Sequence, residues 1–160
     1  MILLNAPIAN TPLFQRLWDS CSFHVCADGG ANRLRKLNKT PNVIIGDLDS
    51  ITPSTRKHYT DTSFVKIVQV LDQDRNDLDK AIDYVKNLHY SNIVVFGAFG
   101  GRFDQQMACF QALYKYHKLL DIYLYNNFTM AFLIQPGTSR LHLALPSTTT
   151  ITVSEGPTCG

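Results

Sequence analysis

The chain has 160 residues, of which 45% are hydrophobic, and its formal net charge at neutral pH is +2. This length and composition predict one globular domain and a fragment of a second. Because no basic run is interleaved with aromatic residues and no apolar stretch reaches the roughly 20 residues that cross a bilayer, we expect neither a nucleic-acid partner nor a membrane span. Four widely spaced cysteines without a C-x-x-C pair predict reduced thiols and a cytoplasmic location.

Short runs rich in β-branched residues alternate with helical patterns over the first three quarters of the chain. The expected strands cover residues 2–5, 23–27, 43–45, 65–70 and 93–96. The expected helices cover residues 12–19, 31–37, 53–59, 78–88 and 103–118, and Asp77 is expected to cap the fourth. Such alternation is typical of βαβ units, so the sequence predicts a three-layer α/β/α fold with a mostly parallel, Rossmann-like sheet.

The pattern changes after residue 121, where strand-like runs follow one another without a helix between them. These runs cover residues 122–125, 130–134, 139–145 and 149–153. They predict antiparallel β structure. Because a few strands without a second layer bury little surface, we expect the sequence to end inside a second domain.

Four short acidic segments follow predicted strands, at residues 26–30, 45–50, 72–77 and 100–104. The carboxyl ends of parallel strands share one edge of a sheet, where ligands of open α/β folds bind, so these acids are expected to converge. Hard cations such as Mg²⁺ take oxygen ligands and usually bring phosphate with them. A Gly-Gly pair lets backbone N–H groups approach that phosphate closely. The chain therefore predicts a Mg²⁺-dependent nucleotide enzyme.

The acids have different expected roles. The candidates for holding Mg²⁺ directly or through water are Asp47, Asp49, Asp74 and Asp77. Asp28 and Asp72 are candidates for orienting the metal's water shell or the substrate. Since successive side chains of a strand alternate in direction, Asp47 and Asp49 reach one ion only if the chain turns at Gly46 or after Leu48.

The fourth segment adds a basic residue. Arg102 is expected to grip a phosphate through its planar guanidinium, and Asp104 to orient Arg102, bind metal or accept a proton from an alcohol. Gly100 and Gly101 keep this loop free of side-chain bulk. The helix expected from Phe103 would direct its positive N-terminal end at an anion.

Four ordered motifs resemble those of the thiamine pyrophosphokinase family. They are Asp28-Gly29-Gly30-Ala31-Asn32, Gly46-Asp47-Leu48-Asp49-Ser50, Asp72-Gln73-Asp74-Arg75-Asn76-Asp77 and Gly100-Gly101-Arg102-Phe103-Asp104-Gln105. The resemblance extends from Leu3 through Gln135-Pro136-Gly137 and the segment 140–142, and Cys159-Gly160 resembles the start of a further motif. Each motif alone is weak, whereas their order along the chain is specific.

The resemblance implies transfer of a diphosphate group from ATP to thiamine, with Mg²⁺ as cofactor, in a homodimer whose active sites lie between subunits. It implies an ATP- and Mg²⁺-binding catalytic domain at 1–120. Residues 121–160 would then hold the last sheet strand or strands and the truncated start of a C-terminal β-sandwich that helps to hold thiamine. The residues expected to contact the cofactor or substrate are Asp28, Gly29, Gly30, Ser50, Asp72, Gln73, Asn76, Gly101 and Gln105.

This sequence departs from the family pattern in three respects. Asn76 stands where the family commonly has Thr, and Gln105 replaces a His that is common in bacterial members, although Gln also occurs in animal members. The third departure is length, because most of the β-sandwich is absent.

Two alternatives remain open from sequence alone. In the first alternative, the shortened chain binds Mg²⁺-ATP or dimerises but does not catalyse a reaction. The second is a phosphohydrolase of the haloacid dehalogenase kind, because Asp47-Leu48-Asp49 after a hydrophobic run resembles its nucleophile loop. That family normally places the loop at the first strand, whereas two strands are expected before Asp47.

Overall fold

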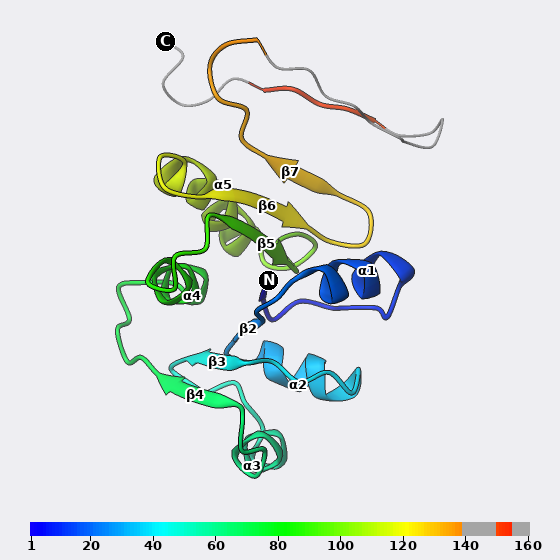
Figure 1. Cartoon of the computed structure of the whole chain (residues 1–160), viewed down its shortest axis with the longest axis vertical. Coiled ribbons are helices and arrows are strands. Elements are labelled where there is room, and N and C mark those ends of the chain that lie inside the picture. Colours follow the sequence, from blue (N-terminus) through cyan, green and yellow to red (C-terminus); the bar gives the residue numbers. More distant parts are fainter. Residues whose placement is uncertain (139–149, 155–160) are drawn as a thin grey trace.

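The computed structural model describes residues 1–138 and 150–154, and these residues form a seven-stranded sheet with helices on both faces (Figure 1). The strands are β1 (Ile2–Leu3), β2 (Val25–Ala27), β3 (Val43–Gly46), β4 (Lys66–Gln69), β5 (Asn92–Phe96), β6 (Asp121–Tyr125) and β7 (Met130–Phe132). The helices are α1 (Pro12–Ser20), α2 (Gly30–Lys36), α3 (Pro53–Thr60), α4 (Asp77–Lys86) and α5 (Phe103–Tyr116). The three-layer α/β prediction is confirmed.

The strand order is β4-β3-β2-β1-β5-β6-β7, and every pair is parallel except β6 with β7. The chain therefore runs outward from β1 to β4, crosses back over the sheet through α4, and continues outward from β5. The order reverses between β1 and β5. In open α/β sheets, such a reversal opens a crevice at the carboxyl ends of the strands.

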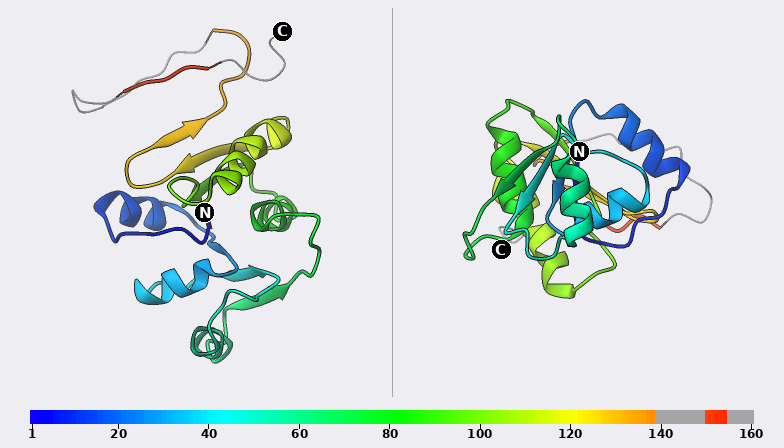
Figure 2. Two further views of the ribbon diagram at one scale, coloured as in Figure 1. Left: turned by 180° about the vertical axis from the view of Figure 1, so that it is seen from behind. Right: turned by 90° about the horizontal axis from the view of Figure 1, so that it is seen from below.

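Two hydrophobic cores lie on the two faces of the sheet. Ile2 and Val95 face the core formed with α4 and α5, whereas their neighbours Leu3 and Phe96 face the core formed with α1, α2 and α3. Figure 2 shows the two groups of helices on opposite sides of the sheet. The strands read as continuous apolar runs because both of their faces are buried.

Helix starts follow local capping chemistry. Thr11 and Thr52 cap α1 and α3 by accepting hydrogen bonds from the backbone N–H groups of Phe14 and Thr55, and a proline begins each helix. The threonine oxygen satisfies a backbone N–H group that has no acceptor within the helix. Proline suits the first helical position because its missing N–H group would have no acceptor there.

Several expectations need correction. The helix expected to be capped by Asp77 is capped by Asn76, and Asp77 is its first residue. The run at 122–125 belongs to β6, which follows a helix and pairs with β5 in parallel; among the described strands, only β7 pairs in the antiparallel sense. The strand expected at 130–134 ends earlier, because β7 stops at Phe132. A strand is also expected at 149–153, but residues 150–153 form none. The run at 139–145 lies outside the described residues.

None of the helices in residues 1–138 and 150–154 combines the length and the apolar character that crossing a lipid bilayer requires.

The core on the α1–α3 face provides a test of packing. Leu34 of α2 is fully buried, whereas Leu119 is 64% exposed. Leu34→Ala is expected to lower the free energy of unfolding by about 2–5 kcal/mol, because it removes buried methyl groups and leaves a cavity. Leu119→Ala is the matched control and is expected to change it by less than about 0.5 kcal/mol. Urea unfolding followed by circular dichroism measures both, and equal effects would contradict this packing.

Candidate active site

Three carboxylates meet at the carboxyl ends of β2 and β3. One oxygen from each of Asp28, Asp47 and Asp49 lies within 4.8 Å of the others. We call these three residues the carboxylate cluster. Asp28 is buried, Asp47 is half-buried and Asp49 is exposed, so the cluster runs from the protein interior to the surface.

Unusual backbone geometry brings the cluster together. Asp28 and Leu48 have positive φ angles of 38° and 69°. The turn at Leu48 lets the Asp49 N–H donate to Asp47 Oδ1 over 3.3 Å, so both acids face the same site. The turn after Leu48 that the sequence required is therefore present. Non-glycine residues in this region are uncommon and are often associated with functional sites.

Asp28 has a buried carboxylate oxygen that points to a ligand. Its side chain is 4% exposed, and its buried Oδ1 has no hydrogen-bond partner among the described residues. A buried carboxylate oxygen without a donor is costly, because nothing replaces the water that it has lost. The Asp28 carboxylate also lies beside those of Asp47 and Asp49, and a hard cation satisfies such an arrangement with oxygen ligands.

Asp77 lies close enough to the carboxylate cluster for the charges of the cluster to affect its pKa. Burial raises the pKa of Asp77 above its ordinary value, and the negative charge of Asp28 raises it further, while the Lys80 ammonium opposes both effects. Lys80 Nζ lies 3.5 Å from Asp77 Oδ1. Asp77, one of the candidate metal ligands, therefore lies near the carboxylate cluster.

The loop before α4 is held by its own side chains. Arg75 Nε donates to Asp72 Oδ2 over 2.7 Å, and Arg75 Nη1 reaches Asp83 Oδ2 over 2.6 Å. Asp72 also accepts from the Asp74 N–H over 2.9 Å. These bonds, led by that from Arg75, lower the pKa of Asp72. Asp72 therefore shapes the loop, while the Asp74 side chain is left exposed.

Asn76 and Asp79 fasten the start of α4. Asn76 Oδ1 accepts from the Asp79 N–H over 2.8 Å, and Asn76 Nδ2 lies 3.3 Å from Asp79 Oδ2. Asp79 in turn accepts from Tyr116 Oη over 2.9 Å and pairs with Lys115 over 3.0 Å, both on α5. The Asn76 side chain is engaged in capping, which places it beside the site in a structural role.

Asn32 and Gln73 hold the loop after β3. Asn32 Oδ1 accepts from the Thr52 N–H over 3.1 Å, and Asn32 Nδ2 donates to the Ser50 carbonyl over 2.8 Å. Gln73 Nε2 lies 3.3 Å from Asp47 Oδ2, so it links the loop before α4 to the cluster. Ser50 Oγ donates to Asp49 Oδ1 over 2.9 Å. These predicted site residues therefore lie together at one edge of the sheet.

The two glycines after Asp28 permit close packing beside the cluster. A Cβ at Gly29 would overlap the Asn5 side-chain amide, and one at Gly30 would lie 3.2 Å from the Leu3 carbonyl oxygen. Gly29 precedes α2 and Gly30 is its first residue. The pair thus lets the start of α2 lie directly against the end of β1.

The segment after β5 stands apart from the cluster. Arg102 caps the backbone of α5 and forms an exposed pair with Asp104, in which Nε lies 3.0 Å from Oδ1. The Arg102 guanidinium lowers the pKa of Asp104. Gly101 and Gln105 are exposed beside them. In the described part of the chain, no hydrogen bond or ion pair joins Arg102 or Asp104 to the cluster.

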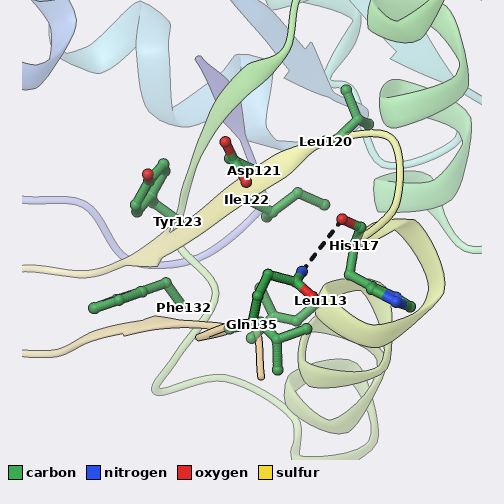
Figure 3. Close-up of a pocket in the computed structure, with 9 residues that line it drawn as sticks. Leu113, His117, Leu120, Asp121, Ile122, Tyr123, Phe132 and Gln135 are labelled. Carbon is green, nitrogen blue, oxygen red and sulfur yellow. Dashed lines mark hydrogen bonds between the residues drawn. The ribbon is translucent and has the colours of Figure 1, made fainter. Parts of the chain in front are cut away.

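Two hollows lie elsewhere. The first measures about 30 Å³ between α5, β6 and the segment after β7, where Gln135 Nε2 lies 3.4 Å from the His117 carbonyl oxygen (Figure 3). It has room for water but not for a nucleotide. The second measures about 270 Å³ and is lined by Phe23, Tyr90 and Asn92 at the amino ends of the strands. Neither hollow includes the carboxylate cluster.

Comparisons with known proteins decide the family. The family described as "Thiamin pyrophosphokinase, catalytic domain" matches residues 14–124. The chain belongs to the thiamin pyrophosphokinase family.

Relatives and solved structures agree with this family. The chain is 30% identical to thiamine pyrophosphokinase 1 of Oryza sativa subsp. japonica, over 90% of this chain and 60% of that protein. It is 31% identical to thiamine pyrophosphokinase 1 of Arabidopsis thaliana, over 100% of this chain and 64% of that protein. The structure of thiamin pyrophosphokinase from Candida albicans matches 82% of this chain and 59% of its own, with a TM-score of 0.71 and 26% identity. The chain thus spans about 60% of the length of these family members.

Sequence reasoning missed two residues of the site. Lys80 is buried beside Asp77, and Gln69 Nε2 donates to the Asp47 carbonyl over 2.9 Å. The helical spacing of Asp77 and Lys80 was a usable signal, since residues three apart share a helix face. Gln69 had no such signal, because its bond depends on the pairing of β3 with β4.

Gly46 offers a test of the cluster's geometry. A Cβ at Gly46, whose φ is +155°, would lie 2.8 Å from Asp28 Cβ. Gly46→Ala is expected to lower the free energy of unfolding by about 1–3 kcal/mol through overpacking. Gly101→Ala is the control, because a Cβ there meets nothing within 4 Å. Chemical denaturation compares the two variants, and an equal loss at both sites would show that Gly46 does not pack against Asp28.

The capping role of Asn76 makes a second prediction. Asn76→Ala is expected to lower the free energy of unfolding by about 1 kcal/mol, because the Asp79 N–H loses its acceptor. Asn76→Thr is expected to retain most of the stability, since Thr also caps helices. Thermal denaturation of both variants provides the measurement. If the Thr variant were as unstable as the Ala variant, capping would not explain the residue.

Proposed function

We propose that the protein is a thiamine diphosphokinase that transfers a diphosphate group from ATP to thiamine and releases AMP. The observation that carries this proposal is the meeting of Asp28, Asp47 and Asp49 in a chain of the thiamin pyrophosphokinase family, with a buried Asp28 oxygen that has no partner among the described residues. The phosphohydrolase alternative has less support, because Asp47 follows the third strand of the chain and the family match covers the whole motif series.

We propose Mg²⁺ as the cofactor. Asp47 and Asp49, with Asp74 and Asp77 from the α4 side, remain the candidate ligands, and the geometry adds Asp28 to this set. All of them supply the carboxylate oxygens that Mg²⁺ prefers. When bound, the ion neutralises phosphate charge and holds the phosphates in position.

Transfer requires an alcohol oxygen aligned with the β-phosphorus of ATP. The thiamine hydroxyl oxygen forms a bond to that phosphorus, the bond from the β-phosphorus to the oxygen bridging it to the α-phosphorus breaks, and that oxygen leaves with AMP. We assign Arg102 to a phosphate, and Asp104 to holding Arg102 or receiving the hydroxyl proton. Gly101 and Gln105 lie beside this pair, and Gly29 and Gly30 beside the cluster, at the edge where the phosphates would bind.

The remaining proposals concern the surroundings of the enzyme. The free thiols of Cys21, Cys26 and Cys109 support a cytoplasmic location. We propose a homodimer whose active sites lie between subunits. We also propose a boundary near residue 120, with the later residues beginning the part that holds thiamine. The relatives extend beyond the matched region, which is consistent with further thiamine contacts outside this chain.

The direct test is an assay of both products. The 160-residue chain is incubated with Mg²⁺, ATP and thiamine, and thiamine diphosphate and AMP are separated by chromatography. We expect equal amounts of both, formed only when thiamine is present, and Asp47→Asn is expected to reduce their formation at least a hundredfold. Nucleotide binding without either product would support the non-catalytic alternative, whereas thiamine-independent phosphate release would support a phosphohydrolase.

The metal site makes its own prediction. Because clustered carboxylates repel one another without a cation, Mg²⁺ with ATP is expected to raise Tm more than ATP alone. Asp28→Asn is expected to reduce this additional shift, since it removes a charged oxygen from the site. Asp121→Asn, at the exposed start of β6, is the control and is expected to keep it. Equal shifts with and without Mg²⁺ in the unaltered protein would argue against a metal site.

A further inference from the structure

Lys80 is the buried basic residue among residues 1–138 and 150–154. Its side chain is only 3% exposed, yet it carries an ammonium group. Burying a lysine is unfavourable unless its charge is compensated, so the position calls for a physical reason. That reason lies in what surrounds its Nζ atom.

The geometry of α4 directs Lys80 toward the strand ends. The helix begins at Asp77 and packs across β2 and β3, the two strands that carry the cluster. Side chains on a helix point back toward its N-terminus. Lys80 therefore extends past Asp77 along the face of the sheet, and Nζ comes to 3.5 Å from Asp77 Oδ1.

The acids outnumber the nearby bases. The positive charge of Lys80 acts to lower the pKa of Asp47, Asp72 and Asp77, which lie around the same edge of the sheet. The other basic groups on this side have their own partners. Arg75 pairs with Asp72 and Asp83, and Lys115 pairs with Asp79. Lys80 thus supplies a buried positive charge beside Asp77, at the edge of the sheet where the carboxylate cluster lies.

We propose that Lys80 is the internal counter-ion of these carboxylates and a positioning residue of the site. It weakens the binding of a bare divalent cation and strengthens the binding of a cation that arrives with phosphate. The cause is charge, because the ammonium repels a free Mg²⁺ and attracts phosphate oxygens over a few ångströms. This inference rests on the metal site of the proposed function.

Isothermal titration calorimetry tests this balance without requiring catalysis. Lys80→Met keeps an unbranched stem and removes the charge. We expect it to bind Mg²⁺ alone roughly tenfold more tightly and Mg²⁺-pyrophosphate roughly tenfold more weakly than the unaltered protein. Lys86→Met, at the far end of the same helix, is the control and is expected to change neither affinity. Lys80→Arg keeps the charge and is expected to retain the original order of the two affinities.

The outcomes separate the counter-ion from the metal site. If the unaltered protein binds no Mg²⁺ and no Mg²⁺-pyrophosphate, the metal site of the proposed function fails. If it binds both, and Lys80→Met leaves the ratio of the two affinities unchanged, or Lys80→Arg shifts it as Met does, the counter-ion role is overturned. If Lys80→Met unfolds in the absence of cation, Mg²⁺ must restore its folding, because the cation then replaces the lost charge. Failure to restore it overturns the proposal.

Discussion

The crowding of negative charge at the carboxyl ends of β2, β3 and β4 is the constraint on which the rest of the site depends. A parallel sheet brings these ends together, and the sequence places Asp28 and Asp47 directly after β2 and β3, and Asp72 in the loop after β4. Like charges at such distances disfavour ionisation and folding unless positive charge or donors compensate them. The structure compensates them unevenly, since Arg75 donates to Asp72 whereas a buried oxygen of Asp28 has no partner within residues 1–138 and 150–154.

Hydrogen bonds anchor the segments around this edge to neighbouring helices. Asn32 fastens the loop after β3 to α2, and Asp79 fastens the start of α4 to α5. The bond between Tyr116 and Asp79 is buried, so it satisfies groups that would otherwise lose water, whereas the Asn32 bonds lie at the surface. The carboxylates are therefore held close together by bonds formed outside the cluster, which is the usual way of preorganising a site for an ion.

The Arg102 segment has a different character. It is exposed, its glycines meet no neighbouring atoms within 4 Å, and its charged pair is internal to the loop. It follows β5, on the far side of β1 from the cluster, so the order reversal of the sheet separates the two halves of the proposed site. A ligand with several phosphates is long enough and negatively charged enough to contact Arg102 and a cation at the carboxylate cluster at the same time.

The sequence by itself determined the layers of the fold, the order of the motifs and the edge of the sheet at which Asp28, Asp47 and Asp49 meet. Hydrophobic periodicity and acids at strand ends can be recognised from neighbouring residues alone. The strand ending at Gly46 and the acids Asp47 and Asp49 after it are an example. Only the tertiary structure decided which of these carboxylates have a partner within the protein and which remain available to a ligand. Arg75 reaches Asp72 across only three residues of one loop. The burial of Asp28 and of Lys80, by contrast, depends on contacts between elements distant in the chain. Local propensity does not encode such contacts, because they arise from the packing of α4 across β2 and β3.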